Sequence, residues 1–154
     1  MNKQQLTDLV IIPTLDEMPK GLSAEAVLAI QMIVAHESTG GTYIAQTKGP
    51  ALGIIQMEPV THDSTWDHGD SIWVNAVKLG IITRAQKLLR KRPDASRLIY
   101  DLRYNVFMAR QRLFMFKESF PVDIDDMSFY LKENWNGPGE ATPDKYRDDF
   151  LRWV

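Results

Sequence analysis

The sequence contains no cysteine, no long apolar run at its N-terminus and no excess of basic charge. Without cysteine, disulfides contribute nothing, and a chain of 154 residues is long enough to bury one core without them. The apolar run Leu9–Ile12 is broken by Pro13, so we expect neither a signal peptide nor a membrane span there. A net charge of −2 at pH 7 argues against a nucleic-acid binder.

Hydrophobic periodicity predicts an all-α protein with a single domain, residues 1–154, in which residues 1–22 form an N-terminal helix and a connector. We expect at most a small irregular or β-like element, near Leu52–Met57. The segments predicted as helices are Gln4–Ile11, Ala24–Ala35, Asp70–Leu79, Thr83–Arg92, Asp101–Phe120, Asp126–Glu133 and Pro143–Trp153, with Pro13–Gly21 as the connector.

One acidic residue, Glu37, ends the apolar helical run that begins after Ser23, a predicted N-cap. Gly40 and Gly41 follow it, and paired glycines favour the end of a helix. A carboxyl at the end of a buried helix loses solvation, which raises its pKa toward the value that a general acid needs near neutral pH. The alternative interpretation is that Glu37 is a surface carboxylate at the end of a helix.

A lone glutamine, Gln56, interrupts the apolar run that follows a turn signal at Gly49-Pro50. A glutamine in such a run requires a hydrogen-bond partner from the backbone, a side chain or a ligand. We therefore predict that the Gln56 side chain has such a partner.

Three blocks in order resemble the soluble lytic transglycosylases and goose-type lysozymes of the lysozyme-like superfamily. The first joins Glu37-Ser38 to Gly53–Gln56, which is similar to a Glu-Ser pair followed by Gly-Leu-Met-Gln. The second is Asp101–Val106, similar to the family's opening of a central helix. The third, Asn134–Gly139, is similar to Tyr-Asn-Ala-Gly-Pro-Gly; either Trp135-Asn136 stands for Tyr-Asn with one residue deleted, or the tyrosine is replaced by Asn134.

The resemblance implies a lysozyme-like fold and cleavage of the β-1,4 bond between N-acetylmuramic acid and N-acetylglucosamine, with Glu37 as general acid and base. It favours a lytic transglycosylase, in which the substrate's own 6-hydroxyl attacks and leaves a 1,6-anhydro sugar. No metal and no cofactor are expected. The substrate-binding residues that it implies are Ser38, Gly53, Gln56, Glu58, Tyr104, Asn134 and Asn136.

Two alternatives stay open. Glu58 lies two residues after Gln56, where goose-type lysozymes carry an aspartate, and a second carboxylate there would give an inverting muramidase. Glu58 is equally explained as an exposed carboxylate at a helix start. The other alternative is a protein that binds murein, or a structural virion protein, without cleaving.

The expected partners are peptidoglycan glycan strands and, as a second class, other virion proteins. A murein-cleaving chain without an export signal fits a bacteriophage enzyme, held in the virion or in the host cytoplasm before release and acting in the host periplasm. Release through a holin lesion and carriage in the virion are equally compatible with the sequence.

Two charged stretches remain outside these motifs. Thr61–Gly69 is predicted as a polar loop, in which Trp66 packs or stacks on sugar; its histidines and carboxylates raise the question of a metal, but they lack the His-x-x-x-His spacing of zinc proteases. The basic stretch Arg84–Arg92 is predicted as a solvated face or as a contact with anionic lipid or envelope phosphate.

Overall fold

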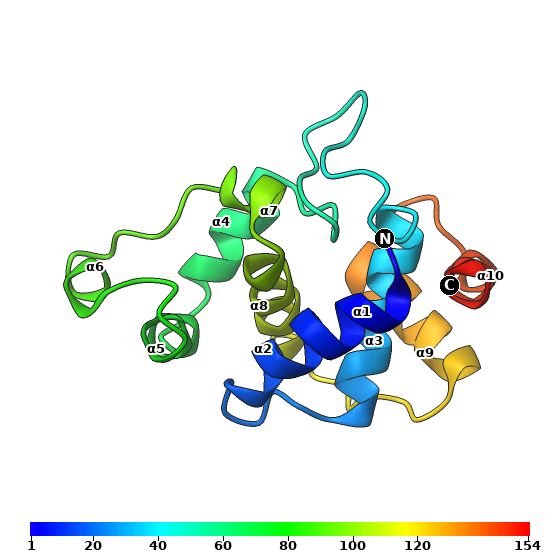
Figure 1. The fold of residues 1–154 in the computed structure, drawn as a ribbon, viewed down its shortest axis with the longest axis horizontal. Helices are drawn as coiled ribbons and strands as arrows, with labels where there is room; N and C mark the ends of the chain where they lie inside the picture. The colour runs from blue at the N-terminus through cyan, green and yellow to red at the C-terminus, as the bar shows by residue number, and fades with distance from the viewer.

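The computed structural model describes all residues, 1–154, and confirms the all-α class, because it contains no β-strand (Figure 1). The helices are α1 (Lys3–Leu6), the π-helical segment η1 (Thr7–Ile11), α2 (Ile12–Asp16), α3 (Ala24–Glu37), α4 (Pro59–Asp67), α5 (Ser71–Lys78), α6 (Arg84–Leu88), α7 (Arg97–Tyr100), α8 (Leu102–Phe114), α9 (Ile124–Leu131), the π-helical segment η2 (Lys132–Asn136) and α10 (Pro143–Arg152). The expected β-like element is present as isolated bridges that pair Leu52 with Ala45 and Met57.

Helices α3 and α8 form the centre of the molecule, with the other helices packed around them (Figure 1). Helix α3 contacts α8, α9, α10 and η1. Half of the residues of α3 and most of those of α8 are buried. One hydrophobic cluster of 33 buried residues extends from Leu6 to Trp153, so both ends of the chain contribute to the same core. This burial on several faces explains why neither central helix has one narrow apolar stripe.

Both ends of α3 follow the sequence prediction. The Ser23 hydroxyl accepts a hydrogen bond from the Ala26 amide at 3.0 Å, so Ser23 is the N-cap. After Glu37 the chain turns through Gly40, which has a φ of 65°. A Cβ on Gly40 would lie 2.4 Å from the Trp153 indole, so this position needs glycine both for its backbone conformation and for the packing of the C-terminus.

A close approach between Gly53 and Asn105 fixes the loop before α4 against α8. A Cβ on Gly53 would lie 2.1 Å from Asn105 Oδ1 and 2.6 Å from the Leu98 carbonyl oxygen. The Asn105 amide nitrogen donates to the carbonyl oxygens of Leu98 and Asp101, both at 2.8 Å. Gly53 and Asn105 therefore join three segments of the chain at one point.

The prediction of a polar loop at Thr61–Gly69 is wrong, because most of this segment belongs to α4. Pro59 occupies the first turn of α4, where its fixed φ favours a helix and its missing amide costs nothing. His62, Thr65 and Trp66 are buried on one face of α4. Their spacing of three and four residues is helical, but the polar residues between them concealed the pattern in the sequence.

Three predicted boundaries also need correction. Pro13 does not end the first helical run, because it lies in the first turn of α2, which continues to Asp16. Helix α8 ends at Phe114, six residues before the predicted end at Phe120. The predicted basic helix ends at Leu88, since the chain turns at Arg90, which has a φ of 53°.

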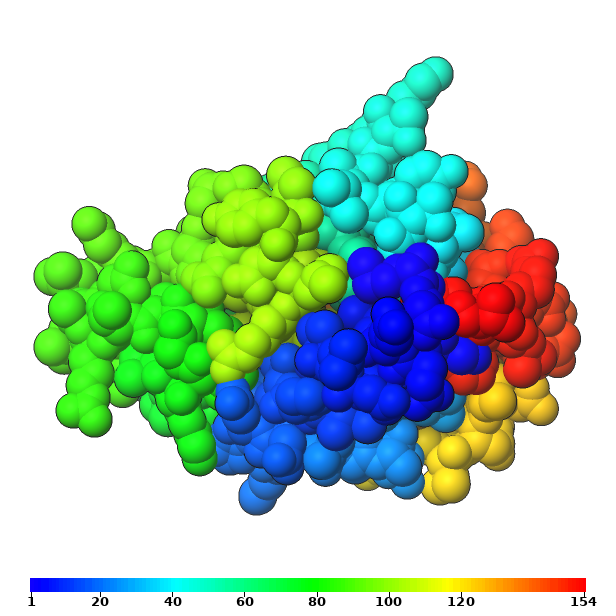
Figure 2. All heavy atoms as spheres, viewed as in Figure 1, coloured from blue at the N-terminus to red at the C-terminus, as the bar shows by residue number.

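The molecule is elongated, with α5 and α6 at one end and α10 at the other (Figures 1 and 2). The segment that joins α3 to α4 projects from the top of the view, above the C-terminal end of α3. None of the helices combines the length and the apolar character needed to cross a membrane. The projecting segment and α10 are the parts of the fold that surround Glu37.

Candidate active site around Glu37

Glu37 is the last residue of α3, and its carboxyl is largely removed from water. Burial raises the pKa of Glu37 above its ordinary value, because desolvation disfavours the charged form. The nearby His36 charge and a hydrogen bond from Tyr146 lower that pKa, but they offset the burial only in part. The carboxyl is thus held closer to a protonated form than an exposed glutamate would be, as the sequence predicts.

Tyr146, in the first half of α10, is the direct hydrogen-bond partner of Glu37. Its hydroxyl donates to Glu37 Oε1 at 3.1 Å, and its ring is fully buried. The pKa of Tyr146 is raised by burial and by the Glu37 charge, so this hydroxyl stays a donor. The bond fixes the orientation of one carboxyl oxygen.

His36 and Asp149 support Tyr146 from the other side. The His36 ring lies against the Tyr146 ring, with 4.3 Å between the two centroids. His36 Nδ1 donates to Asp149 Oδ2 at 2.8 Å, since a carboxylate can only accept, and Asp149 also pairs with Arg152. These contacts join the end of α3 to α10 and restrict the movement of the Tyr146 hydroxyl.

Gln56 approaches Glu37 from the loop before α4. The residue has a φ of 48°, a conformation that is uncommon outside glycine and that clusters at functional sites. Its side-chain amide donates to the Gly53 carbonyl at 2.9 Å, and its backbone amide donates to the same oxygen at 3.1 Å. The prediction that Gln56 has a hydrogen-bond partner is confirmed.

A groove of about 370 Å³ opens at Glu37. Glu37 and Gln56 lie on its wall, and the projecting segment supplies the rest, namely Tyr43, Ala45, Gln46, Thr47 and Lys48. Glu37 is the only carboxylate among these residues, while amides, hydroxyls and an exposed aromatic ring surround it. Such a surface supplies hydrogen bonds and an apolar face, which are the contacts that a sugar chain uses.

Three of the residues predicted to bind substrate belong instead to the framework. Ser38 is fully buried, its hydroxyl donating to the Val34 carbonyl and accepting from the Gly41 amide, so it closes α3. Gly53 is buried against Asn105. Tyr104 is fully buried in the core. Ser38, Gly53 and Tyr104 thus lie in the packed framework and not on the groove wall, which argues against the direct substrate contacts predicted for them: the Ser38 and Tyr104 side chains are buried, and Gly53 has no side chain to present.

Glu58, Asn134 and Asn136 do not line the groove either. Glu58 is exposed at the start of α4, as one reading of the sequence expected. Asn134 donates to the Tyr130 carbonyl, and Asn136 accepts from Lys132, whose ammonium also binds the carbonyl oxygens of the following glycine turn. The two asparagines shape the turn between η2 and α10.

His62 lies in a closed hydrogen-bond network away from the groove. Its Nδ1 donates to Asp63 Oδ1 at 2.8 Å, so Nε2 accepts from the Tyr104 hydroxyl at 2.6 Å, and that oxygen accepts from Trp66 Nε1 at 2.9 Å. Burial lowers the pKa of His62 and keeps the ring neutral. Both ring nitrogens are occupied, and no group of three or more histidine or acidic side chains is placed to hold a metal ion.

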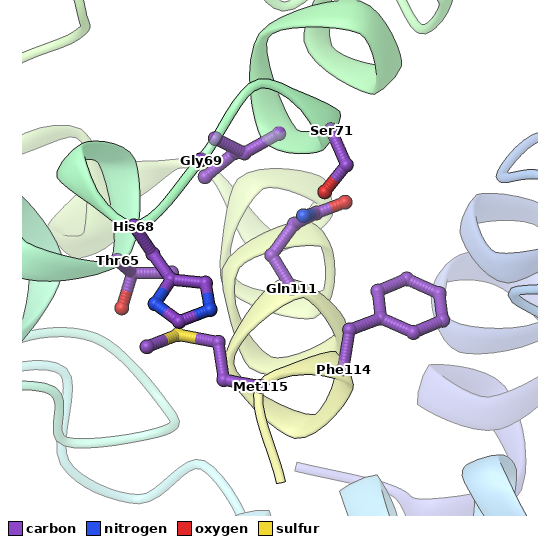
Figure 3. Close-up of a pocket in the computed structure, with 8 residues that line it drawn as sticks. Thr65, His68, Gly69, Ser71, Gln111, Phe114 and Met115 are labelled. Carbon is purple, nitrogen blue, oxygen red and sulfur yellow. The ribbon is translucent and has the colours of Figure 1, made fainter. Parts of the chain in front are cut away.

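Four further pockets lie elsewhere, of which two, beside Asp16 and Glu17 and beside Asp67 and Asp70, have acidic side chains on their walls. The remaining two have one such side chain or none. One, of about 600 Å³, is next to the chain termini, beside Met1 and Trp153. The other, of about 150 Å³, lies between α4, α5 and α8, where the Gln111 amide extends toward Ser71 (Figure 3). The smaller pocket has no carboxylate and the larger one has only Asp149, which is paired with His36. Asp16 and Glu17 are exposed, and Asp67 and Asp70 are exposed and paired with arginines. Among these pockets, the Glu37 groove is the one whose carboxyl has a pKa raised by burial.

Sequence reasoning missed the residues around Glu37 that come from α10. Tyr146 and Asp149 lie more than 100 positions after Glu37, in a helix whose pattern predicts only packing. Tyr43, Gln46 and Lys48 stand in a polar segment that carries no motif. The sequence contains no pattern that indicates either set of residues, because tertiary packing alone brings them next to Glu37.

Comparisons of this chain with protein-family models, with curated proteins and with solved structures found no match. The resemblance of its motifs to lysozyme-like enzymes therefore stays a prediction.

Proposed function

We propose that this protein is a peptidoglycan-cleaving enzyme of the lytic transglycosylase type, in which Glu37 is the general acid and base. The observation that carries the proposal is a desolvated carboxyl with a raised pKa, oriented by Tyr146, at the wall of an open polar groove. A protein that only binds glycan has no use for such a carboxyl, because desolvating it costs free energy.

The first step needs a protonated acid. Glu37 gives its proton to the oxygen of the β-1,4 bond, the bond from that oxygen to C1 of N-acetylmuramic acid breaks, and positive charge develops on the sugar. The resulting Glu37 carboxylate faces this charge and accepts the hydrogen bond from Tyr146. Burial favours the protonated form of Glu37 before this step, and the Tyr146 hydroxyl stabilises the carboxylate after it. The surroundings of Glu37 therefore suit both of its protonation states.

The second step distinguishes the transglycosylase from the inverting muramidase. An inverting enzyme needs a second carboxylate about 6.5–9.5 Å from the first to activate water. Glu37 is the only carboxylate on the groove wall, and Glu58 is exposed at the start of α4. This favours attack on C1 by the 6-hydroxyl of the same sugar, whose proton returns to Glu37 and leaves a 1,6-anhydro product.

The test is the clearing of purified Gram-negative murein by the wild type and by Glu37→Gln, followed by mass analysis of the soluble fragments. The glutamine keeps the shape of the side chain and removes the proton, so we expect cleavage to fall by about 10²–10⁴-fold. Fragments from the wild type should carry anhydro ends. Reducing ends alone would assign the muramidase, and full activity of Glu37→Gln would contradict the assigned acid.

A matched control is Glu58→Gln, which removes an exposed carboxylate from the neighbouring loop. Under the proposal this variant cleaves like the wild type. Loss of cleavage in Glu58→Gln together with reducing ends would restore the inverting mechanism. Murein that pellets with the wild type but is never cleaved would favour the binding protein.

The proposed substrate also implies where the enzyme works. Peptidoglycan glycan strands lie in the periplasm, so a bacteriophage chain would reach them through a holin lesion or from the virion. Immunodetection of the chain in purified particles separates these routes, and other virion proteins are partners only in the second.

A further inference from the structure

The end of the molecule that is formed by α5 and α6 carries a surface that the proposed reaction does not use (Figure 2). From Arg84 to Arg92 the chain has five basic residues and no acidic one. Helix α6 buries none of its residues. It lies at the end of the long axis opposite α10, whereas Glu37 is next to α10 (Figure 1).

Two adjacent leucines form the apolar part of this surface. Leu88 is 83% exposed and Leu89 is 70% exposed, although both are large aliphatic side chains. Single exposed apolar residues are ordinary on protein surfaces, whereas apolar residues that lie together leave a continuous apolar area in contact with water. Helix α5, which packs against α6, adds the half-exposed Val74.

The backbone presents these leucines in a fixed position. A reciprocal capping box between Thr83 and Gln86 starts α6. After α6, Arg90 pairs with Asp70 at 3.0 Å and lies over the Trp73 ring, and Arg92 pairs with Asp67 at 2.7 Å. The leucines are therefore exposed between two anchored segments, so their exposure does not arise from a loose end.

Three cations beside the leucines have no acidic partner. Arg90 and Arg92 are used within the fold, whereas Arg84, Lys87 and Lys91 make no salt bridge. We propose that the Leu88–Leu89 tip, defined as these two leucines with Arg84, Lys87 and Lys91, docks on the surface of an anionic phospholipid bilayer. The leucines enter the boundary between headgroups and acyl chains, and the cations bind lipid phosphates.

A lipid surface matches both parts of the tip. Anionic headgroups complement three unpaired cations, and the acyl boundary directly below them accepts two leucines that a polyanion such as nucleic acid would leave in water. Helix α6 lies at the end of the molecule (Figure 1), a position that suits contact with an interface, because an interface needs no matching cavity. The proposal does not depend on the chemistry at Glu37.

The test is co-sedimentation of the full chain with vesicles of phosphatidylglycerol and phosphatidylcholine, compared with vesicles of phosphatidylcholine alone. We expect binding to the anionic vesicles that weakens as salt rises. Removing both leucines, as Leu88→Ser with Leu89→Ser, should weaken partitioning by about tenfold or more. Each of Arg84→Gln, Lys87→Gln and Lys91→Gln should weaken it about fivefold.

A matched control places the same chemical changes at the other end of the molecule. Leu151→Ser with Lys145→Gln removes a 59% exposed leucine and an exposed lysine from α10, and it should bind vesicles like the wild type. Circular dichroism verifies that each variant keeps its helices. Since all substituted side chains of the tip are at the surface, loss of binding cannot come from loss of the core.

Three results would overturn the proposal. The first is equal binding to neutral and anionic vesicles, or no binding at low salt. The second is that the leucine variant binds anionic vesicles as strongly as the wild type does. Binding would then arise from a diffuse charge attraction alone. The third is that the chain does not bind vesicles but dimerises as its concentration rises, and that the leucine variant abolishes this dimerisation. The tip would then be a contact between two copies of this chain.

Discussion

Two buried ionisable side chains, Glu37 and His62, differ in how completely their hydrogen-bonding capacity is used. His62 is fully buried, and Asp63 and Tyr104 occupy both of its ring nitrogens. Glu37 has one partner, Tyr146, and otherwise opens to a groove. A saturated network stabilises a core, whereas a desolvated group with free capacity is available for chemistry. We therefore expect His62 to contribute to stability, and Glu37 keeps the reactive role proposed for it.

The largest expected effect is on His62. His62→Ala removes a buried ring and leaves the Tyr104 hydroxyl without its acceptor, so the free energy of unfolding should fall by about 2–5 kcal/mol. Urea unfolding at neutral pH measures it. The folded fraction should cleave murein at the wild-type rate; a change below about 1 kcal/mol, or a specific loss of cleavage, would break the distinction between the two residues.

The loss of stability caused by His62→Ala depends on pH, and the direction of this dependence follows from the pKa of His62. Burial lowers the pKa of His62 below its ordinary value of 6.5, so below pH 6.5 the unfolded chain binds a proton that the folded chain does not. The stability that neutral His62 contributes is present above pH 6.5 and is lost as the pH falls. The difference between the wild type and His62→Ala should therefore shrink in acid.

The next effect concerns the hydroxyl that completes the network. Tyr104→Phe leaves His62 Nε2 and Trp66 Nε1 without a partner, at a cost of about 1–3 kcal/mol in the free energy of unfolding. The KM for soluble glycan strands should not change, because the ring does not reach the groove. A rise in KM without a loss of stability would return Tyr104 to the substrate site.

On the Glu37 side, Tyr146→Phe should act on catalysis. The variant keeps the buried ring and removes the donor to Glu37, so we expect kcat to fall about tenfold, the value of one lost hydrogen bond. Because the donated bond lowers the pKa of Glu37, its loss raises that pKa further. The alkaline limb of the pH–rate profile should move to higher pH; an unchanged profile would exclude Tyr146 as the orienting group.

The smallest effect is a gain of stability on removal of the acid. Burial raises the pKa of Glu37 above its ordinary value of 4.5, so the stability linked to its protonated form is present below pH 4.5 and is lost as the pH rises. Glu37→Gln should therefore unfold at higher urea at pH 7, by on the order of 1 kcal/mol, and the difference should vanish in acid. A destabilised Glu37→Gln would mean that the carboxylate is structural.

Local signals made several elements of the fold predictable. The Ser23 cap and the paired glycines after Glu37 each act within one turn of helix, and each has the predicted role. The same local reasoning failed at α4, because its buried face consists of His62, Thr65 and Trp66, which are not an obvious apolar stripe. Their burial depends on partners from α8 that a local pattern does not contain.

Within the candidate site, the sequence indicated Glu37 and Gln56, since an acid and an amide in apolar runs are chemically conspicuous. It misplaced Ser38, Gly53 and Tyr104, whose types suit either a site or a framework. Burial separates these two roles, and burial is a property of the packed chain. The resemblance to lysozyme-like enzymes does not distinguish which side chains face the groove.

The sequence by itself determined the helical class, the position of the acid at the end of α3 and the basic character of the segment from Arg84 to Arg92, because helix periodicity, capping and charge act over a few residues. Only the tertiary structure decided that Tyr146 orients Glu37, that Asp149 on α10 pairs with His36 on α3, and that the Glu37 groove has no second carboxylate. The physical reason is distance along the chain. Contacts between residues more than 100 positions apart exist only once the core is packed.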